Sequence, residues 1–231
     1  SFDPGKPTAL VVSHEASTTG APILALNLCQ QLAADHNVIV LLLKGGPLRA
    51  EFQASAVALI QARRSFVNAK LVTRALKRAS GGQAVQFALV NSVVSAPVLE
   101  PLRSQGIACL CLVHEFVTYI KPLDVFAEIG IWASRVVCST PLTWNDVLRH
   151  CSHLANVPAA VLPQGRCQLP SSLSRKPTGK VEVLAPERDA DSFLAQLPAD
   201  ALLVLGAGAV QPRKGVDLFV AAAQQIRLQA P

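Results

Sequence analysis

Aromatic side chains are scarce in this chain. Phe, Trp and Tyr make up 5% of its 231 residues, and they do not alternate with the basic residues. A net charge of +6 and an isoelectric point of about 9.2 would suit nucleic acid, an anionic membrane surface or a phosphorylated small molecule. Single-stranded nucleic acid stacks its bases on aromatic side chains, so the composition argues against that partner. We therefore expect no nucleic acid among the partners.

Metal-binding and membrane-spanning patterns are also missing. The six cysteines form no CxxC pair, so we expect buried free thiols in a reducing cytoplasm and no metal site. The long aliphatic run at 107–113 is far shorter than the roughly 18 residues that a spanning helix needs. The first residues lack the charged-then-apolar pattern of a signal peptide. These absences predict a cytoplasmic protein.

Two phosphate-binding fingerprints are absent as well. The chain contains neither GxGxxG nor the P-loop pattern GxxxxGK[ST]. A classical dinucleotide site and a P-loop ATPase both depend on those glycines, because the backbone must approach the phosphates closely. An oxidoreductase is therefore only a distant alternative.

What the chain does contain is an alternation of strand and helix patterns. Hydrophobic residues make up 51% of it, and unbroken aliphatic runs are typical of parallel strands buried on both faces. Strands are predicted at 9–13, 38–43, 56–60, 86–91, 107–113, 135–139 and 160–163, and helices at 21–34, 48–52, 66–79, 96–105, 117–130 and 141–148. The pattern predicts an α/β fold with a Rossmann-like parallel sheet and helices on both faces.

Three regions follow one another along the chain. Residues 1–165 carry the alternating pattern and are predicted to be one domain, and 166–200 are predicted to be a linker with a surface helix and turn at 186–198. Residues 201–231 read as a strand at 202–205, a loop, and a helix from Val216. A lone strand–helix unit cannot bury both of its faces, so it either caps the preceding domain or begins a second one. We expect the truncated start of a second Rossmann-like domain.

The loop after the first predicted strand is a candidate phosphate site, because ligands of parallel sheets bind at the carboxyl ends of strands. Gly20 allows a ligand close to the backbone, and Pro22 fits the first turn of a helix. The unpaired N–H groups and the positive dipole end of that helix favour an anion. An ordinary loop capped by Thr19 is the alternative.

Two further clusters carry candidate functional groups. His114 and Glu115 follow the strand at 107–113 and suit sugar hydroxyls or proton transfer, although a structural histidine is the alternative. Arg213 and Lys214 stand at a helix start, where cations oppose the helix dipole. They would suit an anion such as a diphosphate, and two solvated surface cations are the alternative.

The predicted helix at 66–79 is amphipathic and basic. Its cations at helical spacing are Lys70, Arg74, Lys77 and Arg78. Such a face can lie on anionic lipid, and a plain solvated face is the alternative.

Together these features resemble the family-4 retaining glycosyltransferases of the GT-B fold, which pair two Rossmann-like domains around a cleft. The segments that carry the resemblance are SHEASTTGAPILALNL at 13–28, VHEF at 113–116, VVCSTPLTWNDVL at 136–148, VLPQGRC at 161–167 and GAVQPRKGVDLF at 208–219. Each is loose alone, but their order and spacing make the set fairly specific. The resemblance covers nearly the whole chain.

The resemblance implies roles for residues in these segments. Gly20, with Ala21, matches the glycine that abuts the donor diphosphate. His114 matches the residue that contacts the donor sugar near the reaction centre. Lys214 matches the diphosphate-binding lysine. Other positions expected in the cleft are His14, Glu115, Ser139 and Gly165, with Gln164 where the family has Asn.

Two departures from the family pattern stand out. Ala209 occupies the position of an arginine that usually helps to bind the diphosphate, and Arg213 would have to replace it. The E-x7-E motif that holds the nucleotide sugar is absent from these residues. A complete member would need about another 130–170 residues, which is a typical domain.

The resemblance implies a fragment of an enzyme that transfers a sugar, with retention, from a nucleotide-diphosphate donor to a glycan or lipid-linked acceptor. It implies no metal and no cofactor beyond that donor. The basic helix would suit an anionic membrane at its inner face. The alternatives are a nucleotide-sugar epimerase of the same fold and a non-catalytic binding or membrane-docking module.

Overall fold

The computed structural model describes residues 2–62, 69–170, 195–198, 203–206, 210 and 214–229. The chain divides into two units, Ser1–Lys176 and Pro177–Pro231. The predicted boundaries at 165 and 200 stay predictions.

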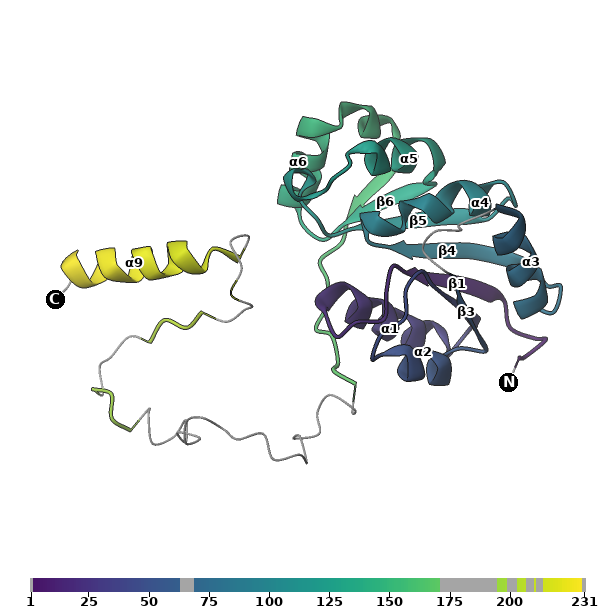
Figure 1. Ribbon diagram of the computed structural model, residues 1–231, viewed down its shortest axis with the longest axis horizontal. Coiled ribbons are helices and arrows are strands. Elements are labelled where there is room, and N and C mark those ends of the chain that lie inside the picture. Colours follow the sequence, from purple (N-terminus) through teal and green to yellow (C-terminus); the bar gives the residue numbers. More distant parts are fainter. Residues whose placement is uncertain are drawn as a thin grey trace. The chain divides into compact units, whose positions relative to one another are not determined.

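The first unit is built on one seven-stranded sheet in which every pairing is parallel (Figure 1). The strand order is β3-β2-β1-β4-β5-β6-β7. The strands are β1 (Thr8–Ser13), β2 (Asn37–Leu42), β3 (Ala58–Gln61), β4 (Val85–Asn91), β5 (Ala108–Val113), β6 (Arg135–Cys138) and β7 (Ala159–Val161). The order reverses between β1 and β4, so the chain leaves these two strands in opposite directions, and the carboxyl ends of such strands are where open parallel sheets bind ligands.

Helices cover both faces of this sheet, which confirms the predicted fold class (Figure 1). They are α1 (Gly20–Leu32), α2 (Arg49–Ser55), α3 (Ala69–Ala79), α4 (Leu99–Arg103), α5 (Asp124–Trp132) and α6 (Pro141–His150). Successive residues of β1 face opposite sides, so Val11 packs with α1 and α2 while Leu10 and Val12 pack with α3 to α6. Both cores therefore depend on the aliphatic runs that predicted the strands.

Two predicted helices are wrong as continuous elements. The segment 96–105 begins as the 3-10 helix η1 (Val93–Val98) and continues as α4, so Pro97 lies inside a 3-10 turn. The segment 117–130 splits into the 3-10 helix η2 (Val117–Tyr119) and α5. Proline lacks an N–H group and disfavours helical backbone in the residue before it, so Pro122 ends the first piece. A further short helix, η3 (Ser152–Asn156), precedes β7.

The second unit contains the predicted helix but not the predicted strand. Helix α9 (Val216–Gln229) follows Gly215, whose carbonyl accepts its first hydrogen bond, from Phe219 N, at 2.9 Å. A strand is expected at 202–205. Residues 203–205 of it are described, and their backbone is irregular. A strand needs a paired neighbour for its backbone groups, and the described residues of this unit provide none. Of the surface helix and turn predicted at 186–198, only 195–198 lie among the described residues, and they form a turn.

Candidate functional site

The carboxyl ends of the central strands lie level with one another. Ser13, the last residue of β1, pairs with Asn91, the last residue of β4, and Val113 of β5 pairs with Cys138 of β6. The residues that follow these strands are His14, Ser92, His114 and Ser139. The topology therefore brings polar residues from four separate stretches of the chain to one edge of the sheet.

A chain of hydrogen bonds runs through this edge from α1 to the segment after β7. Asn91, fully buried, donates from Nδ2 to the carbonyl of Ala21 at 2.9 Å. Its Oδ1 lies 2.8 Å from Nε2 of His114. On the other side of the imidazole, Nε2 of Gln164 lies 2.6 Å from Nδ1. Both ring nitrogens of His114 thus have an amide partner.

This chain of bonds determines the tautomer of His114. Because the amide nitrogen of Asn91 donates to Ala21, its oxygen must face the imidazole, and an oxygen can only accept. Nε2 of His114 therefore carries the proton, and Nδ1 of the neutral ring accepts from Gln164. The inner nitrogen is a donor to the protein, whereas the outer nitrogen is an acceptor whose partner is an exposed side chain.

The environment of His114 favours the same neutral state. Burial lowers the pKa of the imidazole, the charge of Glu115 opposes that shift, and the charge of His14 adds to it. The group is consequently suited to accepting a hydrogen bond from a ligand near neutral pH, and poorly suited to carrying a positive charge.

Glu115 faces the protein. Its carboxylate accepts hydrogen bonds from the Ser92 hydroxyl, from His114 N at 3.0 Å and from Val93 N at 3.5 Å. Ser92 is fully buried with φ of 72°, a backbone conformation that is uncommon for a residue other than glycine. Glu115 thus ties the end of β5 to the turn after β4 and fixes the base of the His114 side chain.

The first turn of α1 is open at the same edge. Thr19 is the N-cap residue, but its side chain makes no capping hydrogen bond, and its hydroxyl lies 2.9 Å from that of Ser17. A Cβ atom built on Gly20 meets nothing within 4 Å. Packing among the described residues does not require a glycine at position 20, so the space before this helix end is open to a ligand.

The segment after β7 is tied back onto α1. Asn27, a buried residue of α1, accepts from Gln168 N at 2.6 Å and donates to Gln168 O at 2.9 Å. This bridge holds the segment that contains Gln164 and Gly165 beside the carboxyl edge of the sheet. Gly165 is exposed, with nothing within 4 Å of a built Cβ.

The other predicted site residues fall in different places. His14 lies beside Glu15, with 3.8 Å between Nε2 and Oε1, and lines a cavity near η1 and η2. Ser139 is half-buried after β6, and Lys214 is exposed in the second unit. Arg213 and Ala209 lie outside the described residues. His14, Gly20, Ala21, His114, Glu115, Ser139, Gln164 and Gly165 belong to one edge of the sheet, and their roles stay predictions.

The basic residues of α3 form a separate surface. Lys70, Arg74, Lys77 and Arg78 are all exposed, while Val72 and Leu76 of the same helix are buried. Helix α3 packs in the core on the face of the sheet opposite α1. Its basic face is therefore present as predicted. These basic residues are separate from the hydrogen-bonded group of Asn91, His114 and Gln164 at the carboxyl edge.

Sequence reasoning missed Asn91, Ser92 and Asn27. The first two had a signal, because they are the polar residues at which the strand predicted at 86–91 ends, where ligand sites of such sheets form. Asn27 had none, since a single polar residue within a helix pattern does not reveal its partner.

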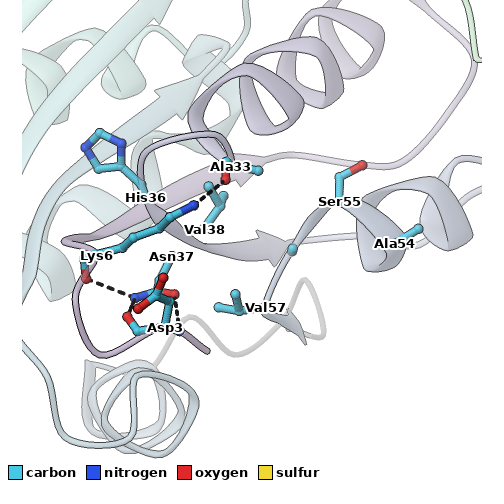
Figure 2. Close-up of a pocket in the computed structure, with 10 residues that line it drawn as sticks. Asp3, Lys6, Ala33, His36, Asn37, Val38, Ala54, Ser55 and Val57 are labelled. Carbon is cyan, nitrogen blue, oxygen red and sulfur yellow. Dashed lines mark hydrogen bonds between the residues drawn. The ribbon is translucent and has the colours of Figure 1, made fainter. Parts of the chain in front are cut away.

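The amino edge of the sheet has a cavity of about 170 Å³, and Figure 2 shows the residues that line it. Asn37 donates to the carbonyls of Asp3 and Lys6 at 2.6 and 3.0 Å and accepts from Asp3 N at 2.8 Å. The ammonium of Lys6 donates to the carbonyls of Ala33 and Ala34 at the end of α1, at 3.5 and 2.6 Å. These polar groups are engaged with the protein and hold the N-terminal segment in place.

The cysteines are free thiols, five of them buried. Burial raises the pKa of Cys29 to about 12 and, with small effects of neighbouring groups, raises the pKa values of Cys109 and Cys138 to about 11. Thiols with such pKa values are poor nucleophiles.

The described residues contain no group of three or more His, Cys, Asp or Glu side chains placed to hold a metal ion. Searched over the same part of the chain, no helix combines the length and apolarity needed to cross a bilayer.

Comparison with known proteins finds similarity only among solved structures. No family model matches the chain, and no curated protein matches it. The chain is similar to Phytolacca americana UGT2 complexed with UDP-2-fluoro-glucose and pterostilbene, with 9% identity over 75% of this chain and a TM-score of 0.49. It is also similar to TcCGT1 in complex with UDP, with 11% identity over 74% of this chain and a TM-score of 0.44. The chain spans 57% and 55% of these two proteins, and at such identities residue roles do not carry over.

Proposed function

We propose that this chain is the N-terminal part of a retaining glycosyltransferase that moves a sugar from a nucleotide-diphosphate donor to an acceptor hydroxyl. The observation that carries the proposal is the state of His114, a neutral imidazole at the carboxyl edge of the sheet with its acceptor nitrogen toward an exposed partner. The sequence resemblance and the strand order support it. The glycan or lipid-linked acceptor and the anionic membrane surface at α3 remain part of the proposal.

In this proposal His114 orients the donor sugar. Asn91 holds the Nε2 proton, so Nδ1 can accept from a hydroxyl group. Gln164 supplies that hydrogen bond in the structure, from an exposed side chain 2.6 Å away. A sugar hydroxyl would replace the Gln164 amide, and the ring would neither gain nor lose a proton.

The donor diphosphate would lie at the first turn of α1. The backbone of Gly20 and Ala21 provides N–H groups, the dipole of a 13-residue helix favours negative charge there, and the space before Gly20 is open. Lys214, and Arg213 in place of the missing arginine, would add positive charge from the second unit. Such groups stabilise the diphosphate as it leaves, and this is the main catalytic effect in the proposal.

The second unit supports the proposal of a larger donor domain. Helix α9 has no buried residue, and its exposed large apolar side chains are Leu218, Phe219, Val220, Ile226 and Leu228. Phe219 does contact Gly206, with ring atoms 3.1 Å from the position of a built Cβ. In the proposal the other exposed apolar side chains of α9 pack against further strands and helices of that domain. Residues 1–231 alone are then expected to fold without transferring sugar.

The test is the full-length protein with a panel of nucleotide sugars and acceptor alcohols. His114→Ala should lower the rate at least about tenfold, or roughly 1.4 kcal/mol in the barrier. His36→Ala, which removes an imidazole at the amino edge, is the matched control and should keep the rate of the folded enzyme. The anomeric configuration of the product tests retention, and reaction of the nucleotide sugar without acceptor would indicate an epimerase instead. Unchanged kinetics of His114→Ala would remove this residue from the site.

A further inference from the structure

The segment 162–168, which we call the strap, returns from β7 across the sheet to α1. Strand β7 is the last strand on one side of the sheet and lies four positions from β1, which α1 follows. At one end of the strap Leu162 N donates to Cys138 O at 2.9 Å, and at the other end Gln168 bonds to Asn27 of α1. The strap therefore passes the carboxyl ends of the strands between β7 and α1 (Figure 1).

Hydrogen bonds and the strap together form a closed circuit that begins and ends on α1. Its members, in order, are Ala21, Asn91, His114, Gln164, Gln168 and Asn27. Asn91 and Asn27 are buried, whereas Gln164 is exposed. The bond from Gln164 to His114 is therefore the member of the circuit that an incoming hydrogen-bond donor can replace most readily.

Asn27 keeps the strap close to His114. Its side chain accepts from Gln168 N at 2.6 Å and donates to Gln168 O at 2.9 Å, and Cys167 packs against the core on the same face of the sheet as α1. Six extended residues cover at most about 20 Å, and four strand spacings are about 19 Å, so the anchored strap has little slack. A group tethered in this way competes at a high effective concentration.

The bond from Gln164 occupies the atom that a ligand needs. In the proposed function Nδ1 of His114 accepts from a sugar hydroxyl, and the single lone pair of Nδ1 accepts one hydrogen bond at a time. We infer that the strap is an autoinhibitory element, in which Gln164 competes with the ligand for His114 and Asn27 sets the strength of that competition. The inference rests on the proposed function for the identity of the ligand.

NMR of the 231-residue chain with 15N-labelled histidine tests the contact without any ligand. Gln164→Ala should move the Nδ1 signal of His114 and leave the Nε2 signal, because the bond to Asn91 is kept. Asn27→Leu should move the Nδ1 signal in the same direction. Gln168→Ala is the matched control and should leave it in place, since Gln168 bonds to Asn27 through its backbone. Circular dichroism checks that the variants fold, and Gln164 is exposed, so its variant should do so.

Titration of the full-length protein with UDP-glucose and GDP-mannose tests the competition. Gln164→Ala should tighten binding about two- to tenfold, which is the effect of one net hydrogen bond on an equilibrium. Asn27→Leu should tighten binding as well, and Gln168→Ala should leave it unchanged.

Two outcomes overturn the inference. One is weaker binding by Gln164→Ala, which would make Gln164 a ligand contact, and the other is an unmoved Nδ1 signal in that variant. Sugar transfer together with either outcome would keep the proposed function. A moved Nδ1 signal in a full-length protein that neither binds nor turns over any nucleotide sugar would refute the proposed function, and with it the competing role, while keeping the contact.

Discussion

The two edges of the sheet carry similar polar residues that are used in opposite ways. At the amino edge, Asn37 donates hydrogen bonds to the N-terminal segment, and Lys6 donates to carbonyls at the end of α1 (Figure 2). At the carboxyl edge, Asn91 and Glu115 hold His114 so that Nδ1 faces an exposed partner. At the first edge Asn37 and Lys6 bond to groups of the chain itself, whereas at the second edge the proposed function places a ligand.

Helix direction explains this difference. In a parallel sheet with crossover helices, helix C-termini meet the amino edge and helix N-termini meet the carboxyl edge. The carbonyls at the end of α1 attract the ammonium of Lys6, which belongs to the chain itself. The N–H groups at the start of α1 attract an anion, and Thr19 does not supply a cap. In the proposed function, the donor diphosphate occupies this position.

The largest expected effect on stability comes from one of two glycines at the carboxyl edge. A Cβ on Gly46 would overlap the backbone carbonyl of Ala16, so Gly46→Ala should destabilise the fold by about 3 kcal/mol. Gly20→Ala should change the free energy of unfolding by less than about 1 kcal/mol, because a Cβ there meets nothing. Urea unfolding of both variants measures this. Equal losses would show that Gly20 is a packing residue and that the open space before α1 is wrongly assigned.

Asn37→Leu tests whether the hydrogen bonds at the amino edge stabilise the fold without contributing to ligand binding. This change removes three hydrogen bonds and leaves Asp3 N without its partner, so the free energy of unfolding should fall by about 2–3 kcal/mol. Because this edge has no proposed ligand, nucleotide-sugar binding by the folded full-length variant should be unchanged. A loss of binding comparable to that of His114→Ala would contradict the division between the two edges.

Asn91→Asp sharpens the comparison at the other edge. The carboxylate still accepts from Nε2 of His114 but cannot donate to Ala21, which should cost about 1–2 kcal/mol of stability. The added negative charge should also raise the pKa of His114. NMR titration of the imidazole measures this pKa, with Asn37→Asp as the control that should leave it unchanged. An unaltered pKa in Asn91→Asp would contradict the hydrogen bond between these two residues.

The smallest effect is a pH dependence from His114. Its pKa is lower in the folded chain than in the unfolded chain, where it is about 6.5, so the unfolded chain binds more protons at acidic pH. The contribution to stability is complete above about pH 6.5 and is lost as the pH falls toward the folded pKa. Thermal unfolding from pH 7.5 to 5 should show this decline, reduced in His114→Gln. Identical profiles for the two proteins would place His114 in an ordinary solvated environment.

Much of the architecture follows from local sequence signals. The unbroken aliphatic runs predicted the central strands because buried parallel strands need apolar residues on both faces. The helix periodicity at 216–223 likewise predicted α9. The strand at 202–205 was less predictable, because pairing depends on neighbours, and the described part, 203–205, is irregular.

By itself, the sequence determined the α/β class, the candidates Gly20 and His114, and the basic face of α3, since each depends on residues close together in the chain. Only the tertiary structure decided how the His114 side chain is held. Asn91 is 23 positions from His114 and 70 from Ala21, Gln164 is 50 positions from His114, and Gln168 is 141 from Asn27. Hydrogen bonds over such separations depend on the order of strands in the sheet, which no local pattern records. That order places the Nε2 proton of His114 on the inner side and leaves Nδ1 as the acceptor.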